Sequence, residues 1–127
     1  KLGGQSQMYT DNANTFYALA AQRRIASYFN LGRDLAKWRN WLATQGPILV
    51  RLDVDSAFMQ ATATKGKLDS YTANSGLGGH CVALVGYVDG RFIVRNSWGT
   101  GWGDKGFAYT ADSYAQPAFT EAYGVVL

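Results

Sequence analysis

Two residues of the sequence could act as a nucleophile and its general base, and they are adjacent. His80 is the only histidine among the 127 residues, and Cys81 is the only cysteine. Both lie in the β-rich stretch GGHCVALVGY, and successive side chains of a strand point to opposite faces. Proton transfer needs heavy atoms about 2.6–3.2 Å apart, which opposite faces do not allow. We therefore expect Cys81 to be a small buried residue and not the thiol that His80 serves.

A second β-rich run, RFIVRNSW, follows the dipeptide Asp89-Gly90, which is a strong hairpin signal. The length of the hairpin loop decides which residues share a face with His80. A two-residue loop pairs Val88 with Arg91. It also places His80 and Asn96 on opposite faces, because the side-chain period of a strand is two.

A three-residue loop, Val88-Asp89-Gly90, gives another register, and it is the one we predict. It puts Gly90 in the left-handed position after a type I turn, with a G1 bulge. Three cross-strand pairs follow from this register: Tyr87 with Arg91, Val82 with Asn96, and His80 with Trp98. His80, Asn96 and Trp98 then project from one face.

This shared face indicates imidazole chemistry. The side-chain oxygen of Asn96 can accept a ring N–H of His80 and select its tautomer, so that the other ring nitrogen can take a proton from a nucleophile. An indole from Trp98 over the pair would exclude competing water. A structural interpretation stands beside this one: His80 satisfies its hydrogen bonds at a sheet edge and Trp98 belongs to the core.

The spacing of apolar and polar residues predicts the helices and strands that must hold these residues. Residues 1–14 are polar and predict a flexible N-terminal arm, and residues 15–127 predict one domain. An extended stretch is expected near residues 24–29. In DLAKWRNWLATQGP, apolar residues recur at helical spacing, Asp34 favours the helix start, and Gly46-Pro47 stops the helix. The apolar face comprises Leu35, Trp38, Trp41 and Leu42.

The remainder of the chain is rich in strand patterns. ILVRLDVD alternates apolar and polar residues, with Ile48, Val50, Leu52 and Val54 on one face. Residues 55–79 show no period, and GFAYTA and AYGVVL predict two further strands. The fold class we expect is α+β: a small antiparallel sheet or partial barrel with one or two packed helices.

Composition narrows the classes of function. A hydrophobic share of 47% and a charged share of 17% indicate a folded domain. The net charge of +3 comes without a basic run, so we expect no nucleic-acid partner, and no apolar stretch predicts a membrane span. One histidine and one cysteine argue against a metal site, and no cofactor is expected. GWGDKG formally matches a dinucleotide fingerprint but precedes a strand pattern and not a helix, which argues against nucleotide binding.

The stretch GGHCVALVGY…FIVRNSWGTGWGDKGF closely resembles the papain family of cysteine peptidases. The shared features are Gly-His at a strand start, V-G-Y before a hairpin, and the N-S-W-G-x-x-W-G-x-x-G run. GPILVRLDVDSAF and the final AYGVVL resemble family strands as well, so the resemblance covers roughly residues 46–127. It implies the fold of the β-rich, right-hand domain of that family.

The resemblance also implies roles for individual residues. His80 would be the imidazole partner of a catalytic thiolate and Asn96 its orienting carboxamide, an arrangement documented for papain-like proteases. Trp98 would shield the pair, and Trp102 would lie near the leaving-group side of the cleft. The residues expected along the substrate groove are Gly79, Val82 and Ala83. Gly90 and Cys81 are expected to be structural.

The family's thiol segment, of the type Gln…Cys-Gly-Ser-Cys-Trp, has no counterpart in residues 1–79. The resemblance therefore implies a chain that is the C-terminal half of a papain-like endopeptidase. Its partners would be a peptide or protein substrate and a missing left-hand domain carrying the catalytic Cys and the oxyanion Gln. We expect the isolated chain to be inactive and to self-associate through the uncovered interdomain face. The family suggests a secreted or extracytoplasmic protein, although no leader peptide follows Lys1.

Two other functions compete with this interpretation. A pseudo-peptidase of the same fold, without a thiol, would be a binding module. An acyltransferase or transglutaminase-like Cys-His enzyme is disfavoured, because such enzymes usually pair the histidine with Asp and this chain carries Asn96.

Overall fold

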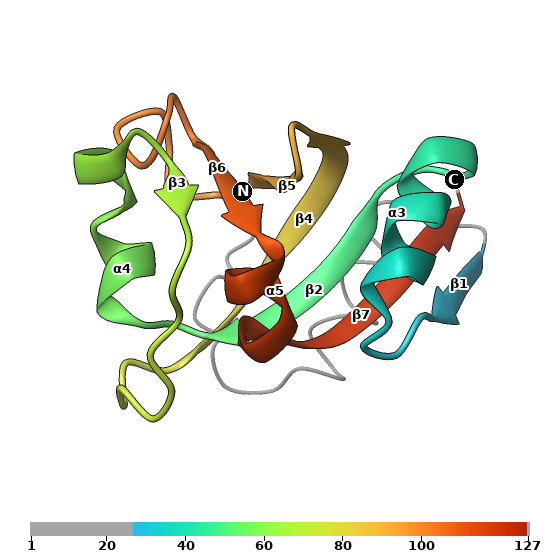
Figure 1. Ribbon diagram of the computed structural model, residues 1–127, viewed down its shortest axis with the longest axis horizontal. Helices are drawn as coiled ribbons and strands as arrows, with labels where there is room; N and C mark the ends of the chain where they lie inside the picture. The colour runs from blue at the N-terminus through green and yellow to red at the C-terminus, as the bar shows by residue number, and fades with distance from the viewer. Residues whose placement is uncertain (1–26, 127) are drawn as a thin grey trace.

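The computed structural model describes residues 27–126 (Figure 1). The predicted arm at residues 1–14 and the start of the predicted extended stretch, residues 24–26, lie outside the described residues. Seven strands form one sheet in the order β1-β7-β2-β4-β5-β6-β3. Their bounds are β1 Ser27–Asn30, β2 Ile48–Asp53, β3 Lys67–Leu68, β4 Gly79–Val88, β5 Arg91–Arg95, β6 Phe107–Ala111 and β7 Phe119–Val126.

The sheet is strongly twisted (Figure 1). Neighbouring strands in it are antiparallel, except that β3 runs parallel to β6. Strand β2 is central, between β4 and β7. Its residues Ile48, Val50 and Leu52 are buried, whereas Leu49 and Arg51 are half-buried, as the alternation of the sequence predicted. The α+β class with an antiparallel sheet is confirmed.

The predicted three-residue loop of the hairpin between β4 and β5 is wrong. Val88 pairs with Arg91, so the loop has two residues and not three. Asp89 and Gly90 both have positive φ, 53° and 76°, which is the backbone of a type I′ turn. This turn matches the right-handed twist of the flanking strands, so it is favoured over a longer loop.

A β-bulge in β4 supplies the extra residue that the loop lacks. The pairing runs Tyr87 with Phe92 and Gly86 with Ile93, then resumes at Leu84 with Val94, which leaves Val85 as the inserted residue. A bulge puts two residues of one strand opposite one of the other and shifts the register by one. The pairing ends at Ala83 opposite Arg95, and Asn96 is the first residue beyond β5. The predicted pair of Tyr87 with Arg91 is wrong, because Tyr87 pairs with Phe92. The predicted pairs of Val82 with Asn96 and of His80 with Trp98 lie beyond the last paired residues of the hairpin.

Helix α3, Leu35–Thr44, is the helix that the sequence predicted. The Asp34 side chain caps it by accepting hydrogen bonds from the backbone N–H of Ala36 (3.0 Å) and of Lys37 (3.3 Å). Leu35 and Trp38 are buried on its inner face.

The positions of two further α-helices and of a 3₁₀ turn were not predicted, although the fold class allowed for a second helix. Helix α4 is Ser56–Met59, the 3₁₀ turn η1 is Ala61–Thr64, and α5 is Asp112–Ala118. One turn of α4 is too short to show a period. Helix α5 has no capping side chain and contains Pro117, which breaks the pattern of a helix. None of the helices within residues 27–126 has the length and apolar character that a membrane crossing requires.

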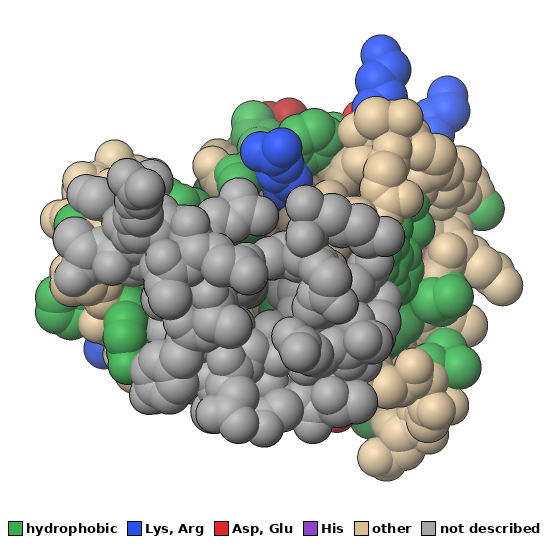
Figure 2. Space-filling view, turned by 180° about the vertical axis from the view of Figure 1, so that it is seen from behind, with side chains coloured by type: hydrophobic (Ala, Val, Ile, Leu, Met, Phe, Trp, Pro, Cys, Tyr) green, Lys and Arg blue, Asp and Glu red, His purple; other side chains and the backbone are tan. Residues whose placement is uncertain are grey.

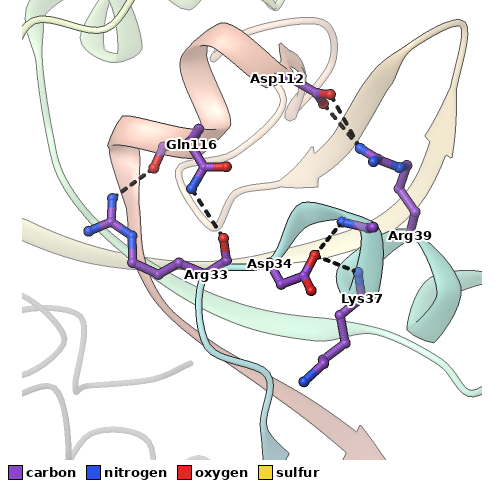
Figure 3. A network of polar contacts seen from close by, with 7 residues as sticks. Arg33, Asp34, Lys37, Arg39, Asp112 and Gln116 are labelled. Carbon is purple, nitrogen blue, oxygen red and sulfur yellow. Dashed lines mark hydrogen bonds and ion pairs between the residues drawn. The ribbon is translucent and has the colours of Figure 1, made fainter.

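Helices α3 and α5 lie side by side over the same face of the sheet and are joined by polar contacts (Figures 1 and 3). Arg33 donates through Nη2 to the backbone oxygen of Gln116 (2.7 Å), and Gln116 donates through Nε2 to the backbone oxygen of Arg33 (3.1 Å). Arg39 and Asp112 form an ion pair at 3.3 Å. These contacts hold the two helices together over the core, in which Trp38 packs against Phe92 and Phe119.

Candidate active site

His80 lies at the start of β4, on the face of the sheet that carries the core. It pairs with Leu52 of β2, and its side chain has 0% exposure. The face that Figure 2 shows has no histidine surface in view among the described residues. An ionisable ring inside a core must have its polar atoms matched, because burial without hydrogen bonds is costly.

Asn96 follows β5 directly and provides such a match. The distance from His80 Nε2 to Asn96 Oδ1 is 2.7 Å, and Asn96 is 8% exposed. The same Oδ1 accepts the backbone N–H of Ser97 at 2.8 Å, which identifies it as the oxygen. Nε2 must therefore carry the hydrogen, and in the neutral ring Nδ1 is the atom that can accept a proton.

Trp98 covers this hydrogen bond. Its ring stacks on the imidazole of His80 with centroids 4.7 Å apart and an angle of 20° between the planes. Trp98 is half-buried and packs against the core. Indole over the pair lowers the local polarity and strengthens the hydrogen bond to Asn96.

Phe58 of α4 is a site residue that the sequence analysis missed. Its ring meets the rings of His80 at 6.0 Å, Trp98 at 5.3 Å and Trp102 at 4.8 Å between centroids. The only local signal was Asp55, an N-cap residue type three positions before an aromatic residue, in a segment without a period. Phe58 forms a third wall of the imidazole site.

The loop of residues 97–106 presents both tryptophans. Trp102 is buried and donates through Nε1 to the backbone oxygen of Phe58 at 2.8 Å. The Thr62 hydroxyl donates to the backbone oxygen of Gly101 (3.1 Å) and accepts from Gly103 N (2.9 Å). Residues 101–106, which formally match the dinucleotide fingerprint, precede strand β6, so the helix that such a site requires is not there.

The side chain of Cys81 projects from the face of β4 that His80 does not share. Cys81 pairs with Arg51 of β2. It is buried and forms no disulfide, as expected. Burial raises the pKa of its thiol to about 11, which the positive charge of Arg51 only partly offsets and the negative charge of Glu121 reinforces. A thiol with this pKa is almost fully protonated at neutral pH and is a poor nucleophile.

The pKa of His80 is shifted in the direction that keeps the ring neutral. Burial lowers it from the ordinary value of 6.5, and the hydrogen bond to Asn96 acts in the opposite sense. A neutral imidazole with Nδ1 as its acceptor atom is the form required of a general base.

The residues expected along a substrate groove fall into different environments. Gly79 is buried, and a Cβ there would collide with the guanidinium of Arg51. Val82 is a member of the hydrophobic core. Ala83 is half-buried on the outer face with Cys81. Among the described residues, no group of three or more His, Cys, Asp and Glu side chains could hold a metal ion.

The sequence of the chain is similar to those of known cysteine proteases. A family model described as "Papain family cysteine protease" matches residues 4–123. The chain is 39% identical over 94 residues to Cysteine proteinase 2 of Entamoeba histolytica, covering 66% of this chain and 28% of that protein. It is 36% identical over 87 residues to Cathepsin B-like CP2 of Giardia intestinalis, covering 64% of this chain and 28% of that protein.

Solved structures match the fold in the same way. Xylellain, a cysteine protease from Xylella fastidiosa, superposes with a TM-score of 0.69 at 24% identity, covering 80% of this chain and 40% of that one. Digestive procathepsin L 3 of Tenebrio molitor larval midgut gives 0.62 at 26% identity, covering 81% and 36%. The chain thus spans less than half the length of each of these four relatives.

Proposed function

Because this chain belongs to the papain family of cysteine proteases, we propose that it provides the catalytic imidazole and its orienting carboxamide for peptide-bond hydrolysis. The observation that carries the proposal is the 2.7 Å contact between His80 Nε2 and Asn96 Oδ1 beneath the stacked ring of Trp98. The nucleophile is a cysteine thiol that these 127 residues do not contain.

Each residue has a distinct task in this proposal. His80 accepts the thiol proton at Nδ1, which the Nε2–H bond to Asn96 makes the basic atom of the neutral ring. Asn96 holds the orientation of the ring, and Trp98 keeps water from the hydrogen bond. Trp102 supports Trp98 at 5.9 Å between centroids, on the side where the leaving group departs.

The reaction is acyl transfer in two steps. The thiol transfers its proton to His80, and the thiolate sulfur bonds to the peptide carbonyl carbon; the C–N bond then breaks as the imidazolium protonates the leaving amine. In the second step His80 removes a proton from water, the hydroxyl oxygen bonds to the acyl carbon, and the C–S bond breaks as the imidazolium returns its proton to the departing sulfur. A thiolate next to the ring would stabilise the imidazolium, which raises the low pKa that burial imposes on His80.

The thiol belongs to a partner segment in this proposal, a left-hand domain with the catalytic Cys and an oxyanion Gln. Two observations support this. Cys81 faces away from His80 with a raised pKa, and the chain spans only 28% of Cysteine proteinase 2. The 127 residues alone are therefore expected to be inactive, and the surface that meets the partner segment is expected to favour self-association.

Covalent labelling of the full-length protein tests the function. A peptidyl epoxide should modify one cysteine other than Cys81 and abolish peptidase activity, and His80→Ala should lower kcat by about 1,000-fold or more while the protein remains folded. A full-length protein with no second cysteine, or with no labelling, would instead be a pseudo-peptidase that binds peptides. Retention of full activity by His80→Ala would exclude the proposed role of the imidazole.

A further inference from the structure

Asp55 is a buried carboxylate at which three segments of the chain meet. It is 1% exposed and precedes the single turn of α4. Oδ1 accepts the backbone N–H of Phe58 at 2.9 Å and the hydroxyl of Tyr114 at 2.7 Å, and Oδ2 accepts the backbone N–H of Thr72 at 3.0 Å. The donors come from α4, from α5 and from the loop that leads into β4. A buried charge is retained only with such compensation, so these bonds define where the three segments lie.

Phe58 connects this carboxylate to the imidazole. Its ring is fully buried and contacts the rings of His80, Trp98 and Trp102. The backbone oxygen of Phe58 also accepts the indole N–H of Trp102. A four-residue helix has almost no stability of its own, so the position of Phe58 depends on its cap and its packing.

We propose that Asp55 is a positioning residue for His80, because its carboxylate holds α4 and thereby the Phe58 ring against the imidazole and its tryptophan cover. Asp55 acts through Phe58 and does not touch the reacting atoms. The catalytic part of this inference rests on the proposed function, since it requires His80 to act in the reaction.

The loop before β4 connects the carboxylate of Asp55 to His80 by a second route. The bond from Thr72 N ties the loop of residues 69–78 to Asp55, and Val54 N donates to Gly78 O at 2.8 Å. The segment that leads into His80 and the Phe58 ring that packs against His80 are thus both held by hydrogen bonds to Asp55 or to the residue next to it.

The hydroxyl of Tyr114 is a hydrogen-bond donor to Asp55 that does not ionise near neutral pH. The side chain of Tyr114 is fully buried, and burial, followed by the hydrogen bond to Asp55, raises the pKa of its hydroxyl far above the ordinary value. The hydroxyl therefore remains protonated and continues to donate to Asp55 over the range in which His80 titrates.

The test is Asp55→Asn in the full-length protein. The amide keeps the size of the side chain but places an N–H donor in the position of one oxygen, where it opposes either the N–H of Thr72 or that of Phe58. We expect kcat to fall by about 10- to 100-fold with KM nearly unchanged, as for a misplaced catalytic group. We also expect the pKa of His80, followed by NMR of imidazole resonances assigned with His80→Gln, to rise towards its ordinary value as water reaches the ring.

Two variants separate positioning from stability. Tyr114→Phe removes one of the three bonds to Asp55 and should produce smaller changes in the same direction; it decides the matter if Asp55→Asn does not fold. Phe92→Leu weakens the core next to Trp38 and Tyr87 and should lower stability without changing the pKa of His80.

The outcomes distinguish this inference from the proposed function. An unchanged kcat and an unchanged His80 pKa in the folded variants would overturn the role of Asp55, even if His80→Ala is inactive. If His80→Ala is fully active, the catalytic proposal fails, and the His80 pKa in Asp55→Asn still decides whether Asp55 positions the ring.

Discussion

At the scale of single residues, one hydrogen bond selects the chemistry of the imidazole. The amide oxygen of Asn96 can only accept, so Nε2 of His80 carries the proton and Nδ1 becomes the basic atom. His80 lies in β4 and Asn96 directly follows β5, which makes the tautomer a property of the tertiary structure.

Replacing Asn96 with Ala should lower kcat in the full-length enzyme by about tenfold or more. The ring of His80 would lose its acceptor, and a buried N–H without a partner costs about 1–3 kcal/mol. Steady-state kinetics should show the loss mainly in kcat. Asn40→Ala, an exposed position on α3, is the matched control and should be as active as the parent protein. Equal activity of both variants would remove Asn96 from the mechanism.

Cys81 should react slowly with iodoacetamide at pH 7 and faster as the pH rises towards 11. Its pKa is raised to about 11 by burial, so few molecules carry the thiolate at neutral pH. Mass spectrometry of the Cys81 peptide after timed labelling measures the rate. Cys81→Ser should keep full peptidase activity, and inactivation of the enzyme by this substitution would contradict the assignment of the nucleophile to another segment.

At the scale of elements, the bulge at Val85 decides which residues share a face. The two-residue turn alone would set His80 and Asn96 on opposite faces, and the inserted residue reverses this for the half of the hairpin that carries the site. The hairpin can thus combine a favourable type I′ turn with the site register.

Deletion of Val85 should disconnect His80 from Asn96. The strands would pair in one register from the turn onward, which places the two side chains on opposite faces unless the ends slip. We expect peptidase activity to fall by about 100-fold or more, together with loss of the NMR signal of the hydrogen-bonded Nε2–H. Val85→Ala keeps the bulge and should preserve both, because this side chain is exposed. A fully active deletion variant would show that the bulge is dispensable.

At the scale of the whole molecule, the site is part of the core. His80 continues the buried row of Val82 and Leu84 on β4, and it packs against Phe58, which belongs to the same core. Protonation of the ring is therefore coupled to the stability of the fold.

The free energy of unfolding should decrease as the pH falls below about 6.5, the ordinary pKa of histidine. The folded-state pKa of His80 lies below that value. Between the two pKa values the unfolded chain therefore binds more protons than the folded chain. As the pH is lowered through this range, the free energy of unfolding decreases, and it stops decreasing below the folded-state pKa. Above pH 6.5 both states are neutral at this position, and the effect vanishes. Urea denaturation at a series of pH values measures it, and His80→Gln should remove this component. An identical pH dependence in that variant would contradict the coupling.

Much of the fold could be predicted because its signals are local. The alternation of residues 48–54 predicts the central strand, the apolar spacing of residues 35–42 predicts α3, and Asp89-Gly90 marks the hairpin. By contrast, the single turn of α4 and the Pro117-containing α5 have no periodic signature, because tertiary contacts and not propensity stabilise them.

The sequence by itself determined the identity of the candidate chemical groups and the separation of His80 from Cys81, because alternation along a strand is a property of the backbone. Only the tertiary structure decided the register, since a bulge has no distinct residue signature and its placement depends on how the inner face packs. It also decided that Phe58 and Asp55 support the imidazole, since their contacts join segments that are distant along the chain.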